Sequence, residues 1–86
     1  MFKIEFSHLA AKELGKVYNI DRKLYSRFIA VIETLKTNPY QGKRLKGKLA
    51  GDYSLRLGNY RIIYMVKEER LIIYIIDLGH RSEIYK

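Results

Sequence analysis

Two segments with strand-like sequences, joined by Gly58-Asn59, constrain the fold of this chain most strongly. Apolar side chains fall at every second position of Tyr53–Leu57, and the segment Tyr60–Val66 is rich in residues that favour strands. The dipeptide between them is a signal for a two-residue turn, which predicts an antiparallel hairpin. A third strand is predicted over Leu71–Leu78, covered on both sides because its apolar residues fall on both faces.

The residues before the hairpin predict one strand and two helices. Residues 1–6 alternate apolar and charged side chains, as a half-buried strand does. Ser7 is a favourable N-cap for a short first helix, which we expect to be interrupted near Gly15. A longer amphipathic helix is expected from Ile20 to Asn38, with Asp21 as its cap.

The order of these elements defines the expected architecture. Pro39 ends the second helix, and the glycine-containing segment Tyr40–Asp52 predicts a loop or an irregular basic arm. A chain of 86 residues has room for one core, so we expect a single domain over residues 1–86. Its predicted fold is α+β, in the order β-α-α-β-β-β, with two helices on one face of a mostly antiparallel four-stranded sheet.

The composition argues against a metal centre and against a membrane-spanning segment. The chain has no cysteine and two histidines, which leaves little basis for a metal centre, and we expect neither a metal nor a cofactor. The longest apolar run, Leu71–Ile76, is far shorter than the roughly 20 residues that span a bilayer, and residues 1–6 lack the apolar stretch of a signal peptide. We therefore expect a cytoplasmic protein that does not bind membranes.

Positive charge is concentrated in the middle of the chain. The formal net charge is +8, and the segment Lys36–Arg61 contains seven basic residues and one acidic residue. Concentrated positive charge favours an anionic partner, such as a phosphate backbone or an acidic protein. The alternative is a solvated face that only aids solubility.

The predicted hairpin places two arginines opposite each other. With a two-residue turn, Arg56 faces Arg61 on the side of the hairpin away from its apolar residues. Like charges at such positions oppose strand pairing, whereas an anion between them makes the net electrostatic interaction attractive. A guanidinium can hold two phosphate oxygens at once. The alternatives are that both side chains extend into water or that they pair with Asp77 and Glu83.

The element order, the string YSLRLGNYRIIYMV and the ending LGHRSEIY together resemble the RelE/ParE superfamily of type II toxin–antitoxin toxins. The resemblance implies a compact toxin that an antitoxin neutralises, and we expect an acidic amphipathic antitoxin segment over the basic face. In the RelE branch it implies cleavage of messenger RNA in the ribosomal A site. The alternative is a ParE-like toxin that inhibits DNA gyrase by binding it and lacks the nuclease residues.

Matching positions identify the candidate site residues. The resemblance assigns the nuclease chemistry to Arg56, Arg61, Arg81 and Tyr85. The sequence departs from the pattern at Ser54, where the best-known ribosome-dependent members carry a lysine, and this removes one cation. Basic residues on a flexible arm suit phosphates of ribosomal RNA better than catalysis. The expected RNA-binding or ribosome-binding residues are Lys43, Arg44, Lys46, Lys48 and His80.

The expected reaction is metal-independent attack of a 2′-hydroxyl on the adjacent phosphate. It requires a base near the 2′-oxygen, cations around the phosphorane and a proton or charge for the leaving oxygen. The arginines at 56 and 61 suit the phosphorane. Arg81 could neutralise the leaving group or donate a proton to it, and the electrostatic role is favoured because arginine is a weak acid. Tyr85 and His80 are the candidate general bases. For Tyr85 the alternative is an aromatic plug, and for Arg81 it is an ion pair with Glu83.

Overall fold

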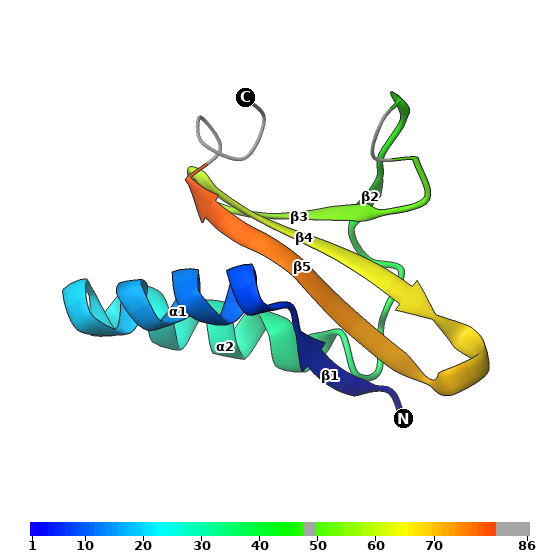
Figure 1. Cartoon of the computed structure of the whole chain (residues 1–86), viewed down its shortest axis with the longest axis horizontal. Coiled ribbons are helices and arrows are strands. Elements are labelled where there is room, and N and C mark those ends of the chain that lie inside the picture. The colour runs from blue at the N-terminus through cyan, green and yellow to red at the C-terminus, as the bar shows by residue number, and fades with distance from the viewer. Residues whose placement is uncertain (48–49, 81–86) are drawn as a thin grey trace.

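A computed structural model describes residues 1–47 and 50–80, in which two helices cover one face of a five-stranded sheet (Figure 1). In chain order the elements are β1 (Lys3–Phe6), α1 (His8–Ile20), α2 (Arg22–Thr34), β2 (Lys43–Arg44), β3 (Tyr53–Leu57), β4 (Tyr60–Lys67), the 3-10 turn η2 (Glu68–Arg70) and β5 (Ile72–His80). The predicted α+β architecture is confirmed.

Side-chain caps determine where the helices begin. The Ser7 hydroxyl oxygen accepts a hydrogen bond from the Ala10 backbone N–H at 2.9 Å, and the Asp21 carboxylate accepts one from the Leu24 N–H at 3.1 Å. The expected interruption near Gly15 is wrong, because α1 continues to Ile20. A lone glycine costs a helix only about 1 kcal/mol, which burial of the apolar face offsets. Neither α1 nor α2 is long and apolar enough to cross a bilayer.

The second helix is shorter than predicted. It ends at Thr34 rather than at Asn38, and the chain continues through hydrogen-bonded turns before Pro39. Leu35, which follows the helix, is fully buried. The apolar pattern therefore extended past the last helical residue, because the turn that follows also packs on the core.

The sheet is mixed and has one strand more than predicted. Its order is β1-β5-β4-β3-β2, with β1 parallel to β5 and the remaining neighbours antiparallel. The additional strand is β2, which lies in the segment expected to be a loop. Its Lys43 pairs with Ser54, and its Arg44 pairs with Tyr53. Two residues are too few for the alternation that predicts a strand.

The hairpin has the predicted register. Arg56 lies directly opposite Arg61, and Leu55 lies directly opposite Ile62. Gly58 in the turn has a φ of 60°, which glycine adopts without steric cost. Because successive side chains of a strand point to opposite faces, the two arginines project from the face opposite to Leu55 and Ile62.

The core fills the space between the helices and one face of the sheet. Phe28 from α2 and Tyr64 from β4 are completely buried there. Six residues of the hairpin and of β5 are among those that belong to the core cluster or pack against it: Leu55, Leu57, Ile62, Tyr64, Ile73 and Ile75. Arg56 and Arg61 therefore project from the opposite face of β3 and β4.

Candidate functional site

The two facing arginines line a hollow on the face of the sheet away from the helices. The hollow has a volume of about 340 Å³, and we call it the arginine hollow. Its lining residues are Lys43, Leu45, Ser54, Arg56 and Arg61. Of these five described residues, three are cationic and none is acidic, so the surface favours an anion.

The register of β2 brings Lys43 to the arginines. Lys43 lies opposite Ser54, and Arg56 follows two residues further along β3, so these side chains project from the same face. Ser54 is buried, with 9% of its surface exposed, whereas Lys43 and Arg56 are exposed and Arg61 is half-buried. Cationic side chains therefore surround a buried hydroxyl. The sequence had associated Lys43 only with the basic arm.

Tyr64 holds the beginning of this arm against the sheet. Its hydroxyl donates a hydrogen bond to the Pro39 carbonyl oxygen at 2.8 Å and accepts one from the Gly42 N–H at 3.0 Å. Burial raises the pKa of the Tyr64 phenol, so the group stays protonated and can donate. A Cβ at position 42 would lie 2.7 Å from the phenol oxygen, so glycine is required for this approach. The contact fixes the backbone immediately before Lys43.

Tyr64→Phe is expected to destabilise the fold by about 1 to 3 kcal/mol, because it leaves the Gly42 N–H and the Pro39 carbonyl without the phenol. Chemical denaturation measures this loss, and hydrogen exchange at the backbone amides of β2 should become faster. Tyr18→Phe is the matched control, because Tyr18 is 41% exposed on α1, and it should change stability by no more than about 0.5 kcal/mol. Equal stability of the two variants would contradict the role of Tyr64.

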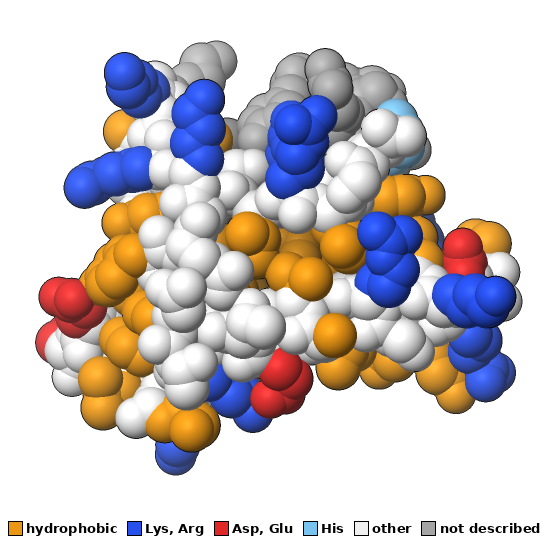
Figure 2. Space-filling model, turned by 180° about the vertical axis from the view of Figure 1, so that it is seen from behind, with side chains coloured by type: hydrophobic (Ala, Val, Ile, Leu, Met, Phe, Trp, Pro, Cys, Tyr) orange, Lys and Arg blue, Asp and Glu red, His pale blue; other side chains and the backbone are white. Residues whose placement is uncertain are grey.

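A second cationic hollow adjoins the first. It has a volume of about 270 Å³ and is lined by Lys43, Arg44, Leu45 and Lys46. Lys43 and Leu45 line both hollows, so the two are neighbours. In Figure 2, which shows the molecule from behind, several Lys and Arg side chains lie along its upper part, and hydrophobic side chains lie below them. An extended cationic surface of this kind suits a phosphate backbone better than a compact ligand.

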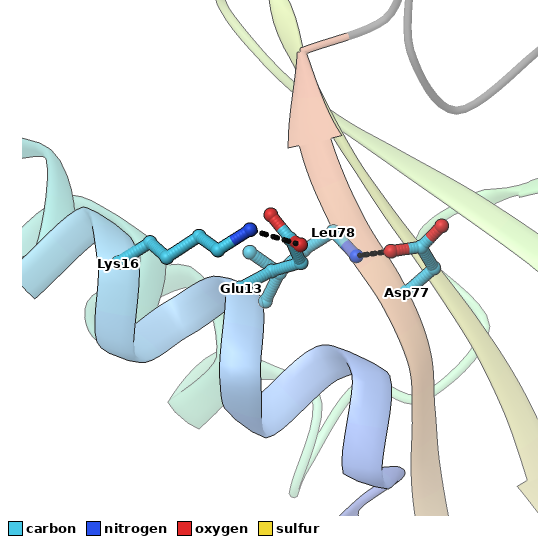
Figure 3. A network of polar contacts seen from close by, with 4 residues as sticks. All are labelled: Glu13, Lys16, Asp77 and Leu78. Atoms are coloured by element: carbon cyan, nitrogen blue, oxygen red, sulfur yellow. Dashed lines mark hydrogen bonds and ion pairs between the residues drawn. The ribbon is translucent and has the colours of Figure 1, made fainter.

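His80 lies apart from the arginine hollow. It pairs with Tyr60 across β4 and β5, and the two rings meet edge-on with their centroids 5.5 Å apart. Together with residues of α1 and α2, His80 lines a different hollow of about 410 Å³. Glu13 and Lys16 also line it and form an ion pair at 3.3 Å (Figure 3). The surroundings of His80 therefore include charges of both signs.

Asp77 lies on the opposite side of β5 from α1. Its carboxylate accepts a hydrogen bond from the Leu78 N–H at 2.8 Å, and in Figure 3 the side chain points away from α1. In the ladder Asp77 is opposite Ile63, which in turn is opposite Ser54. Asp77 thus shares the face of the arginines but is not among the residues that line their hollow.

Three of the predicted site residues lie outside the described residues: Lys48, Arg81 and Tyr85. Their roles stay predictions. Within the described part of the chain, sequence reasoning did not place Leu45 or Ser54 in a site. It treated Ser54 only as a lost cation, but the position of Ser54 was readable. Its position in the alternation of β3, two residues before Arg56, was the signal that could have placed it in the hollow.

A comparison with family models identifies the group of proteins to which the chain belongs. Residues 4–85 match the family described as the ParE toxin of the type II toxin–antitoxin system parDE. The chain belongs to this family. The resemblance to the RelE/ParE superfamily is thereby confirmed, and it extends over nearly the whole printed sequence of the toxin.

Named relatives of the toxin are RelE and RelG proteins. The putative toxin RelE1 of Methanocaldococcus jannaschii is 34% identical over 99% of this chain and 96% of its own length. The mRNA interferase toxin RelE of Escherichia coli is 27% identical over 95% of this chain and 87% of its own. Toxin RelG of Mycobacterium tuberculosis is 40% identical over 45 residues, and this match spans 52% of its length.

Solved structures share the fold of the toxin. The toxin–antitoxin complex RelBE2 of Mycobacterium tuberculosis contains a chain that is 29% identical, with a TM-score of 0.76 over 93% of this chain and 98% of that one. A YoeB/ParE toxin from Agrobacterium tumefaciens is 20% identical, with a TM-score of 0.85 over 93% of this chain and 99% of that one. The chain is thus a RelE-like toxin of a type II toxin–antitoxin system.

Proposed function

We propose that this toxin is a metal-independent endoribonuclease that cleaves messenger RNA in the ribosomal A site, in the cytoplasm. The observation that carries the proposal is the arginine hollow, where Arg56, Arg61 and Lys43 surround the buried Ser54 and none of the described lining residues is acidic. The relative from Escherichia coli is named an mRNA interferase, which supports messenger RNA as the substrate.

The facing arginines suit the charge that develops at the phosphate. When the 2′-hydroxyl attacks, the phosphorane carries more negative charge than the ground-state phosphodiester, so cations held around it lower the barrier. Arg56 and Arg61 lie directly opposite each other, and an anion between them relieves their mutual repulsion. Arg81 and Tyr85 complete the proposed chemistry, with roles that come from the resemblance.

The two neighbouring cationic hollows support two macromolecular partners. Lys43, Arg44 and Lys46 suit phosphates of the messenger or of ribosomal RNA, because these side chains are exposed beside the arginine hollow. The second partner is a cognate antitoxin, as in the related RelBE2 complex. Its acidic amphipathic segment would cover the same charge, so binding of RNA and of antitoxin would exclude each other.

Expression of the toxin followed by mapping of new 5′ ends on translated messages tests the function. We expect cuts in phase with codons, 2′,3′-cyclic phosphate ends upstream of each cut and intact DNA, because attack by the 2′-hydroxyl gives these ends. A 5′-phosphate on the downstream fragment would instead indicate attack by water and contradict the proposed chemistry. Equal cleavage of ribosome-free RNA would contradict ribosome dependence.

The family description favours one alternative, a ParE-like toxin that inhibits DNA gyrase without hydrolysing RNA. The same experiment decides between the two functions. DNA breaks accompanied by uncut messages would establish the alternative, and the arginine hollow would then serve to bind protein or DNA.

A further inference from the structure

Among the described residues that line the arginine hollow, Lys43 carries the cation that can release a proton. Its neighbours Arg56 and Arg61 carry guanidinium groups, which keep their protons in proteins. An ammonium group is a compact charge with three protons, and lysine serves as a proton-transfer group in many enzymes. The hollow therefore combines fixed charge with one group suited to proton transfer.

We propose that Lys43 is the general acid that protonates the 5′ leaving oxygen during RNA cleavage. The proposal rests on the nuclease function proposed above and adds a catalytic role for a residue that the sequence assigned to ribosomal RNA. With the phosphate between the facing arginines, the leaving oxygen must point to one side of the pair. Lys43 lies on the side toward β2.

The strand register supports this placement. Arg56 follows Ser54 by two residues on β3, and Lys43 is the partner of Ser54 on β2, so Lys43 and Arg56 are diagonal neighbours across the ladder. The Cα atoms of such neighbours are about 7 to 8 Å apart, which long side chains can bridge. Ser54 between them has a small side chain, so space remains for a ligand oxygen within reach of both.

The backbone that carries Lys43 is held in place, as a catalytic position requires. The Tyr64 hydroxyl anchors Gly42 through the Gly42 N–H at 3.0 Å, and Lys43 is the next residue. The following residue, Arg44, is paired with Tyr53 in the sheet. Lys43 thus begins a short paired strand, which limits the positions that its side chain can reach.

The 2′-hydroxyl loses its proton to the base, and its oxygen forms a bond to phosphorus. The bond between phosphorus and the 5′-oxygen breaks, and its electron pair stays on that oxygen, which takes a proton from the Lys43 ammonium. The products are a 2′,3′-cyclic phosphate and a 5′-hydroxyl, and the neutral lysine regains a proton from water.

The test compares two messages on programmed ribosomes in single-turnover reactions with the full-length toxin. One carries a normal phosphodiester at the cleaved position. The other carries sulfur in place of the 5′ bridging oxygen, and the thiolate that leaves from it needs no proton. Lys43→Ala and Lys43→Arg should each cut the normal message about 10² to 10⁴-fold more slowly than wild type. Both should cut the sulfur message at nearly the wild-type rate.

Controls separate proton transfer from charge and from folding. Lys12→Ala, which removes an exposed cation from α1, should cut both messages at the wild-type rate. Arg61→Ala should stay slow on the sulfur message, because its charge is needed at the phosphorane. A Lys43→Arg variant at wild-type speed, or Lys43 variants that remain slow on the sulfur message, would overturn the general-acid role. If wild-type toxin cuts neither message, the nuclease function itself is refuted.

Discussion

Replacing Arg61 by alanine is expected to slow message cleavage by about 10² to 10³-fold, the loss that follows removal of one preorganised group that stabilises transition-state charge. Arg61 is half-buried on β4 and faces Arg56 across the hairpin, so one side of the proposed phosphate site would be lost. The rate is measured on programmed ribosomes with saturating toxin. In cells the same variant should relieve growth inhibition.

The stability of this variant provides an independent readout. Removal of one of two facing like charges should change the free energy of unfolding by no more than about 1 kcal/mol, because cross-strand pairs contribute amounts of this order. Arg70→Ala, in the exposed turn η2, is the matched control and should cut normally. A folded Arg61→Ala protein that cuts messages at the wild-type rate would rule out the assigned role.

Replacing Phe28 by alanine is expected to destabilise the toxin by about 3 to 5 kcal/mol, the usual cost of truncating a buried aromatic ring. Phe28 is completely buried on α2, and its ring meets Tyr60 edge-on at a centroid distance of 5.8 Å. Small domains have total stabilities of about 5 to 15 kcal/mol, so much of the fold's stability would be lost.

Thermal denaturation measures the effect of Phe28→Ala. For a domain of this size, 1 kcal/mol corresponds to a shift of about 4 to 8 °C, so the Tm should fall by more than about 10 °C. Leu9→Ala is the matched control, because Leu9 is 48% exposed on α1 and its truncation should move the Tm little. A Phe28→Ala protein with a wild-type melting curve would show that the ring does not anchor α2 to the sheet.

The hairpin was predictable because its determinants are local. A two-residue turn sets the register, so the pairing of Arg56 with Arg61 followed from Gly58-Asn59 alone. The same register puts Ile62 and Tyr64 on the face of the apolar residues of β3, and both are buried. The two cations at the centre of the candidate site were therefore placed correctly before any long-range contact was known.

The contribution of β2 to the site was not predictable, because its determinants are distant in sequence. The Tyr64 hydroxyl binds Gly42 and Pro39, which lie 22 and 25 residues before it. No pattern near Lys43 indicates that this residue starts a strand, since β2 has only two residues. The sequence therefore identified Lys43 as a cation but did not predict that it lies beside Arg56 and Arg61.

The parallel pairing of β1 with β5 bears on how the toxin folds as it is synthesised. The Ser7 hydroxyl donates to the Ile76 carbonyl oxygen at 2.6 Å, a contact between residues 69 positions apart. The first strand to leave the ribosome, β1, can therefore pair with β5 only after β5 has been synthesised. Such non-local pairing slows folding. A nascent toxin remains incomplete until β5 emerges, which gives an antitoxin that is already present in the cell time to engage the polypeptide before it matures.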